Sequence, residues 1–135
     1  MQRFHMSNFI KPPLISNLTN TEYYLKSKTL AERQRESSNI RDKYPDRVPV
    51  ICKKTPHSNL CVLEKTKYLI PLDLTASQFM YIIRKRLKLK SEQALFLFVN
   101  NTIPSSTKTM ADLYEEHVDD DGFLYISYTE ENVFG

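Results

Sequence analysis

The segment Ala94-Leu-Phe-Leu-Phe-Val99 places the strongest constraint on the fold, because it is an unbroken apolar run that ends at Asn100-Asn101. A strand with apolar residues on both faces needs cover on both faces, which is typical of the interior of a sheet. The chain has 135 residues, 41% of them hydrophobic, which is enough for one packed core and some appended chain. We therefore expect one domain built on a sheet, with this run inside it.

The segments around the run predict the other elements. In chain order these are a surface helix over Leu30–Tyr44 that ends before Pro45, a strand over Val48–Lys54, a turn at Thr55–Asn59, a second strand over Leu60–Leu72, a helix that begins after Thr75, a short helix over Thr109–His117, a turn at Asp119–Gly122 and a last strand over Phe123–Tyr128. Pro49 favours an edge strand or a strand start. The order, a helix and then ββαβαβ, predicts an α+β fold, the ubiquitin-like β-grasp: a four-stranded mixed sheet with an added N-terminal helix. The apolar run and the last strand are both expected to be interior strands.

The helix after Thr75 carries the clearest local signals. Thr75 and Gln78 have the spacing of a capping box, in which each side chain satisfies a backbone amide of the first turn. Its expected buried side consists of Phe79, Ile82, Ile83 and Leu87. The basic run Arg84–Lys90 admits two interpretations, a solvated helix face or a nucleic-acid patch, and the continuing apolar positions favour the first.

Several classes of function have no support in the sequence. Cys52 and Cys61 lack metal-ligand spacing and lie in apolar surroundings, so we favour buried free thiols, as in a cytosolic protein, over a disulfide. No apolar stretch approaches 18 residues, and the amino terminus lacks the apolar core of a signal peptide. The three histidines are scattered, and the residues after Asp119–Asp121 break the alternation of a calcium loop. We expect no enzyme activity, no metal and no cofactor.

The two ends of the chain differ from its middle. Residues 1–28 read as an N-terminal extension of uncertain order, residues 29–129 as the β-grasp domain with its helix, and residues 130–135 as a flexible polar tail. The tail ends at Gly135, one of only two glycines. A terminal glycine has no β-carbon, so its carboxylate can enter a narrow channel, although about one chain in fourteen ends in glycine by chance.

A set of motifs resembles one family. These are Ile40-Arg-Asp-Lys-Tyr-Pro-Asp-Arg-Val-Pro-Val-Ile51, Lys67-Tyr-Leu-Ile-Pro-Leu-Asp-Leu-Thr75, Gln78-Phe79, Ile83-Arg-Lys-Arg86, Phe96-Leu-Phe-Val-Asn-Asn101, Asp121-Gly-Phe-Leu-Tyr125 and the end Glu131-Asn-Val-Phe-Gly135. From about residue 30 to residue 135 the chain resembles the autophagy ubiquitin-like modifiers, the family of GABARAP and the microtubule-associated protein light chains. Residues 1–28 do not resemble the family's usual short N-terminal helix.

The resemblance implies a conjugation pathway. It implies that Gly135 is activated by an E1-like enzyme, passed through thioesters to an E2-like enzyme and joined by an amide to phosphatidylethanolamine on autophagosomal membrane. A cysteine protease processes and deconjugates family members, and the protein itself is expected to be a cytoplasmic monomer that binds no nucleic acid. Phe134 either seats the tail in these enzymes or is a frayed aromatic. The alternative function is a β-grasp peptide-binding adaptor that is never conjugated.

The resemblance also implies docking of aromatic-x-x-aliphatic receptor motifs as an added strand at the sheet edge beside Pro49. The implied aromatic pocket consists of Glu36, Ile40, Pro49, Lys67, Leu69 and Phe123. The implied aliphatic pocket consists of Tyr68, Ile70, Pro71, Leu74, Phe79 and Ile82. Arg47, Lys65 and Arg86 are the implied contacts for acidic residues that flank the motif. Ordinary core packing is the alternative role for each apolar residue, and exposure separates the two.

Overall fold

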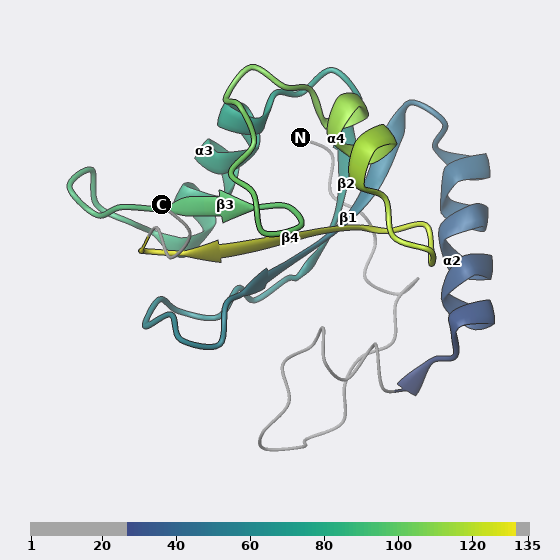
Figure 1. Cartoon of the computed structure of the whole chain (residues 1–135), viewed down its shortest axis with the longest axis horizontal. Coiled ribbons are helices and arrows are strands. Elements are labelled where there is room, and N and C mark those ends of the chain that lie inside the picture. Colours follow the sequence, from purple (N-terminus) through teal and green to yellow (C-terminus); the bar gives the residue numbers. More distant parts are fainter. Residues whose placement is uncertain (1–26, 132–135) are drawn as a thin grey trace.

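The structure is a computed structural model that describes residues 27–131 (Figure 1). Its elements are α2 (Leu30–Lys43), β1 (Arg47–Lys54), β2 (Lys67–Pro71), α3 (Ala76–Leu87), β3 (Phe96–Phe98), α4 (Met110–His117) and β4 (Leu124–Thr129). The four strands form one sheet in the order β2-β1-β4-β3. The predicted α+β fold, a four-stranded mixed sheet preceded by a helix, is therefore confirmed.

The strand register makes β1 and β4 the two central strands. β1 pairs antiparallel with β2, with Val48 opposite Ile70, and parallel with β4, with Val50 opposite Leu124. β3 pairs antiparallel with β4 alone, with Leu97 opposite Tyr128. A parallel pair needs a crossover connection between its strands, and here α3, β3 and α4 all lie between β1 and β4 in sequence.

The interior position predicted for the apolar run is wrong, and so is the edge alternative for Pro49, whereas the other alternative, a strand start, fits its place as the third residue of β1. β3, the apolar run, lies at an edge, and β1, which contains Pro49, lies inside. Apolar residues on both faces of a strand indicate that other elements pack above and below it. They do not indicate whether a strand pairs with it on each side. Pro49 is tolerated inside the sheet because the pairing of β1 with β4 begins one residue later, at Val50.

The second strand is shorter than predicted, because residues 60–65 pack on the sheet without joining its ladder, which begins at the Thr66 carbonyl. The hydroxyl of Tyr128 donates to the carbonyl of Cys61 at 2.7 Å and accepts from the amide of Leu63 at 3.0 Å. Leu63 is buried in the main core, so the apolar pattern of this segment reflects packing. Both cysteines are free thiols as predicted, but only Cys52 is buried and Cys61 is exposed.

Each of α2, α3 and α4 begins with a capping box. Thr29, Thr75 and Thr109 are the N-caps, and Glu32, Gln78 and Asp112 return the reciprocal hydrogen bonds. The box predicted at Thr75 is confirmed, and a bridge between Thr75 and Thr109 ties the starts of α3 and α4 together. A capped start fixes where each helix enters the fold, which is how these two helices are placed over the same part of the sheet.

Two apolar cores lie on opposite faces of the sheet. α3 and α4 cover one face and bury Phe79, Ile83 and Leu113 there, whereas α2 stands against the other face at one end (Figure 1). The smaller core under α2 consists of Ile40, Ile51, Leu69 and Phe123, with Tyr44 and Tyr125 at its border. No helix within residues 27–131 is long and apolar enough to cross a bilayer.

A polar joint fastens α2 to the turn before β4. The buried carboxylate of Asp121 accepts hydrogen bonds from Arg33 Nε at 3.0 Å, from the Phe123 amide at 2.9 Å and from the Tyr125 hydroxyl. Ser37 Oγ donates to the carbonyl of Asp121 at 2.6 Å. The adjacent Gly122 has φ +88°, and a β-carbon there would lie 2.1 Å from Ser37 Oγ. Only glycine both adopts this positive φ angle without strain and leaves room for the Ser37 side chain.

We predict that Gly122→Ala lowers the free energy of unfolding by about 2 kcal/mol or more, since it combines left-handed strain with a steric clash. Denaturant unfolding measures the change. Ser37→Gly combined with Gly122→Ala should cost less than the sum of the two single changes, because the clash is then absent. Additive costs would show that the clash contributes nothing.

Candidate functional site

The edge strand β2 is the centre of the candidate site. Hydrogen-bonded and non-bonded pairs alternate along an antiparallel ladder, and the Cys52 amide donates to the Thr66 carbonyl at 2.7 Å. The backbone groups of Tyr68 and Ile70 consequently face β1, whereas those of Lys67 and Leu69 face away from the sheet. An added strand would therefore pair with the backbone of β2. Pro49 itself lies on β1, the strand next to this edge.

The side chains of β2 alternate between the two cores. Leu69 lies in the smaller core under α2, and Tyr68 and Ile70 lie in the main core under α3. The residues predicted for the two pockets therefore lie mostly on opposite faces of the same strand. One edge thus has an α2 side and an α3 side.

The aromatic-pocket residues gather on the α2 side but are mostly buried. Ile40, Leu69 and Phe123 belong to one core cluster, and Leu69 is opposite Pro49 in the ladder. The exposed fractions are 6% for Ile40, 5% for Lys67, 4% for Leu69 and 1% for Phe123. Core packing is therefore one role of these residues, and Glu36 is the member of the set nearest to the surface.

A hollow of about 250 Å³ lies on the α2 side. Glu36 and Ile40 line it together with Asn39, Lys43 and Tyr44, three residues that were not predicted. Glu36, Ile40 and Tyr44 are spaced by four residues, so they follow one face of α2 to its end. This spacing in the sequence was the signal that could have added Tyr44 to the predicted set.

Lys67 is a buried cation on this side of the strand. Burial lowers the pKa of Lys67 to about 7, and the nearby carboxylate of Glu36 opposes that shift. The Nζ of Lys28 lies 4.0 Å from Glu36 Oε1, so two lysines share the field of one carboxylate. The electrostatics of the α2 side therefore depend on the protonation of Lys67.

The residues predicted for the aliphatic pocket gather on the α3 side, except Pro71, which alternation along β2 places on the same face as Lys67 and Leu69. Tyr68, Ile70 and Phe79 are buried, and the Tyr68 and Phe79 rings meet edge-on with centroids 6.1 Å apart. The partly buried members are Pro71, Leu74 and Ile82. A hollow of about 290 Å³ on this side is lined by Tyr81, Ile82, Lys85 and Arg86, so Ile82 is the member that borders open space.

The three predicted basic contacts surround β2. Lys65 precedes one end of the strand, and Arg47 lies opposite Pro71 at the other. The guanidinium of Arg86 stands 5.4 Å from the centre of the Tyr68 ring, on the α3 side. Positive charge therefore flanks both ends and one face of the edge.

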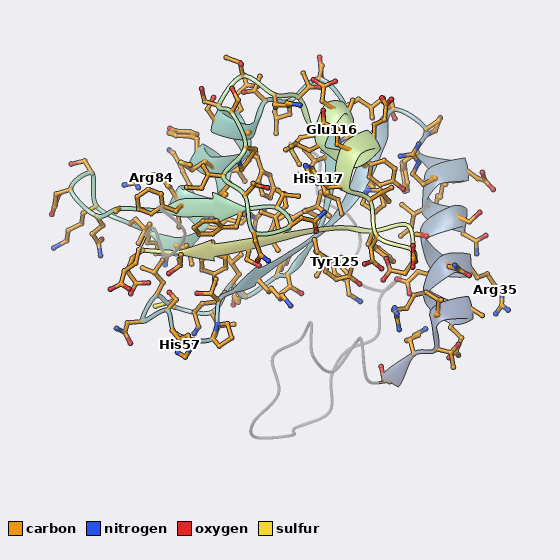
Figure 2. All side chains as sticks on the ribbon, in the orientation of Figure 1. Arg35, His57, Arg84, Glu116, His117 and Tyr125 are labelled. Carbon is orange, nitrogen blue, oxygen red and sulfur yellow. The ribbon has the colours of Figure 1, made fainter. Side chains whose placement is uncertain are left out.

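Other predicted features take ordinary structural roles. Arg84 donates to the carbonyls of Lys90 and Gln93, each at 2.8 Å, so the first residue of the basic run holds a loop (Figure 2). Lys85, Lys88 and Lys90 are exposed. Among residues 27–131 no three His, Cys, Asp or Glu side chains are grouped as metal ligands.

Gly135, the predicted conjugation residue, and its neighbour Phe134 lie outside the described residues. The described root of the tail is anchored, which the sequence did not predict. The Glu130 carboxylate accepts from Ser58 Oγ at 2.6 Å and from the Asn59 amide at 2.9 Å. These bonds hold the pKa of Glu130 at about 2. The tail therefore leaves the domain beside the turn that follows β1.

Comparison with known proteins gives one consistent result. Residues 32–135 match the profile of a family described as autophagy protein Atg8, ubiquitin-like. Autophagy-related protein 8a of Arabidopsis thaliana is 53% identical over 109 residues, which cover 81% of this chain and 89% of that protein. Autophagy-related protein 8 of Schizosaccharomyces pombe is 52% identical over 104 residues, or 77% of this chain and 86% of that protein.

Two solved structures have the same fold. The crystal structure of Trypanosoma brucei ATG8 superimposes with a TM-score of 0.75 at 43% identity, covering 83% of this chain and 97% of the other. Plasmodium falciparum Atg8, solved in complex with a Plasmodium falciparum Atg3 peptide, gives a TM-score of 0.73 at 35% identity, covering 78% of this chain and 94% of the other.

We predict that Lys67 makes the protein more stable as the pH rises from about 7 toward 10. The pKa of Lys67 is about 7 in the folded protein and near 10.5 in the unfolded chain, so within this window the unfolded state binds more protons. The desolvation cost of the charge is complete below pH 7 and is relieved above it.

Urea unfolding at a series of pH values measures this effect. Lys67→Met should remove the rise, whereas Lys85→Met, at an exposed site on α3, should leave it in place. Identical pH profiles for the wild-type and Lys67→Met proteins would contradict the prediction.

Proposed function

This chain belongs to the Atg8 family of ubiquitin-like autophagy proteins, and on that premise we propose that it is conjugated through Gly135 to phosphatidylethanolamine. The observation that carries the proposal is the extent of the family match, which runs from residue 32 to Gly135 itself. Modifiers of this family are non-enzymatic. The chain therefore supplies the acyl group, and the thiols that carry it belong to partner enzymes.

The proposed partners are an E1-like enzyme, an E2-like enzyme and a cysteine protease that processes or releases the modifier. The Plasmodium falciparum relative was solved with an Atg3 peptide, which supports binding of the E2-like enzyme by this chain as well. Residues 1–28 would be an extension, residues 29–129 the folded module and residues 130–135 the conjugation tail.

The lipid would provide the membrane attachment. Each buried methylene group contributes about 0.8 kcal/mol to membrane binding, so a lipid with two acyl chains anchors a module of this size firmly. The protein would then move between the cytoplasm and the autophagosomal membrane as the amide is made and cleaved.

We further propose that β2 receives aromatic-x-x-aliphatic receptor motifs as an added strand. Side chains alternate along a strand, so the first and fourth residues of such a motif point to opposite faces. Two hollows also lie on the helices that cover opposite faces of the sheet, one on α2 beside Ile40 and one on α3 beside Ile82. Arg47 and Lys65 at the ends of the strand would pair with acidic residues before or after the motif.

Conjugation is tested with family E1-like and E2-like enzymes, ATP and liposomes that contain phosphatidylethanolamine. We predict a lipid-sized mass gain located at Gly135, because its carboxylate is the proposed acyl group. Gly135→Ala should reduce or abolish the gain. If the folded wild-type protein gains no mass, the alternative function, an unconjugated β-grasp adaptor that binds peptides, replaces this one.

Peptide docking is best tested at Ile82, since Tyr68 and Leu69 are each only 4% exposed and their replacement would disturb the cores. We predict that Ile82→Ala weakens binding of an aromatic-x-x-aliphatic peptide by about tenfold, or about 1.4 kcal/mol, through loss of buried apolar area. Isothermal titration measures the affinity. Ile103→Ala, at a 44% exposed isoleucine in the loop before α4, is the matched control and should bind normally. Equal affinities for the two variants would exclude the α3-side pocket.

A further inference from the structure

A third hollow, away from β2, lies on the part of the sheet face that α2 leaves uncovered. It has a volume of about 330 Å³, and its lining includes Lys53, Pro56, His57, Phe98, Asn101 and Ser127. Lys53 is opposite Ser127 in the β1–β4 ladder, and Phe98 is opposite Ser127 in the β3–β4 ladder. These three residues therefore form one row across three strands, which is the floor of the hollow.

The walls and rim of this hollow come from segments near the tail. His57 projects from the turn that follows β1, on the side of the sheet away from α3 (Figure 2). Thr129 and Glu131, the last strand residue and the last described residue, also line the hollow. The chain thus leaves the described domain at the rim of the hollow.

From this geometry we infer that the hollow is a docking site for the chain's own C-terminal segment, residues 132–135, with the Phe134 ring inside it. The apolar members of the lining are Pro56, which is exposed, and Phe98, which is 3% exposed and borders the hollow from below. Lys53, His57 and Asn101 supply groups that can donate to the carboxylate of Gly135. One aromatic residue followed by one carboxylate matches the apolar and basic members of a lining that also includes the acidic Glu131 at the rim.

The length and starting point of the tail fit this site. Four residues beyond Glu131 reach about 13 Å when extended. Neighbouring strands lie about 4.8 Å apart, so the row from β1 to β3 is about 10 Å wide. The bonds from Ser58 and Asn59 to Glu130 hold the start of the tail against the turn that contains His57. The anchor thereby reduces the conformational entropy that docking would cost, because it already holds the first residue of the tail at the rim of the hollow.

The size of the hollow favours the tail over a folded partner. Pockets that enclose small ligands measure about 300–1,000 Å³, so a volume of about 330 Å³ suits one or two side chains. Docking would hold Gly135 against the domain and away from an enzyme's channel. This consequence rests on the proposed conjugation, but the docking itself does not.

Phe134→Trp gives a direct test in the full-length protein, because the chain contains no tryptophan. We expect a blue-shifted emission and weak quenching by acrylamide. Ser127→Arg, which fills the floor of the hollow, should raise the quenching constant about threefold, to that of an exposed indole. Ser38→Arg, at an exposed position of α2, is the matched control and should not change it. The inference would be overturned if the Phe134→Trp protein already had the quenching constant of an exposed indole, or if Ser127→Arg did not change that constant.

Charge reversal tests the carboxylate contact separately. In the Phe134→Trp background, Lys53→Glu should lower the ratio of docked to free tail about threefold, the size expected of a partly exposed ion pair. Lys85→Glu on α3 makes the same charge change far from the hollow and should have no effect. Equal effects of the two changes would contradict a contact between Lys53 and Gly135.

A second measurement avoids the larger tryptophan ring. Amide NMR spectra of the natural chain and of Phe134→Ala should differ at His57, Asn101 and Ser127 as well as in the tail. Differences confined to residues 130–135 would overturn the inference. None of these measurements uses the conjugation enzymes, so failure of tail docking and failure of conjugation are separate results.

Discussion

The joint between α2 and the turn before β4 is the contact on which the α2 side of the molecule depends. Asp121 takes three hydrogen bonds from Arg33, Phe123 and Tyr125, and Ser37 bonds to its carbonyl. A buried carboxylate is costly unless it is paired and hydrogen-bonded, so its partners hold one arrangement. That arrangement fixes how far α2 stands from β2, and hence the shape of the hollow beside Ile40.

The strand β2 combines two demands that usually conflict. Its side chains fill both cores, and its outer backbone groups, at Lys67 and Leu69, face away from the sheet. An edge of this kind can recruit another strand without a change in the core, because pairing uses only the backbone. Specificity must then come from the few border residues beside the hollows, such as Ile82, and from the flanking charges.

The two proposed sites, on opposite parts of the sheet, both combine apolar surface with basic side chains. On the two sides of β2, the hollows on α2 and α3 and the flanking basic side chains suit a peptide supplied by another protein. On the opposite part of the sheet, the row from Lys53 to Phe98 suits the chain's own last residues. The Glu130 anchor decides this difference, because it starts the tail at the rim of its site.

The sequence by itself determined the kind and order of the elements and the capping box at Thr75, because helical period, capping boxes and turn residues are local properties. Its motifs also pointed to the family and to Gly135. Only the tertiary structure decided which strands are edges and that residues 60–65 pack without pairing. It also decided that most residues predicted for the two pockets are buried. The same holds for the hollow beside Phe98 and the anchor at Glu130. Strand pairing and exposure depend on contacts between residues far apart in the chain, such as Ser58 and Glu130. A local sequence pattern does not indicate which distant residues make such contacts.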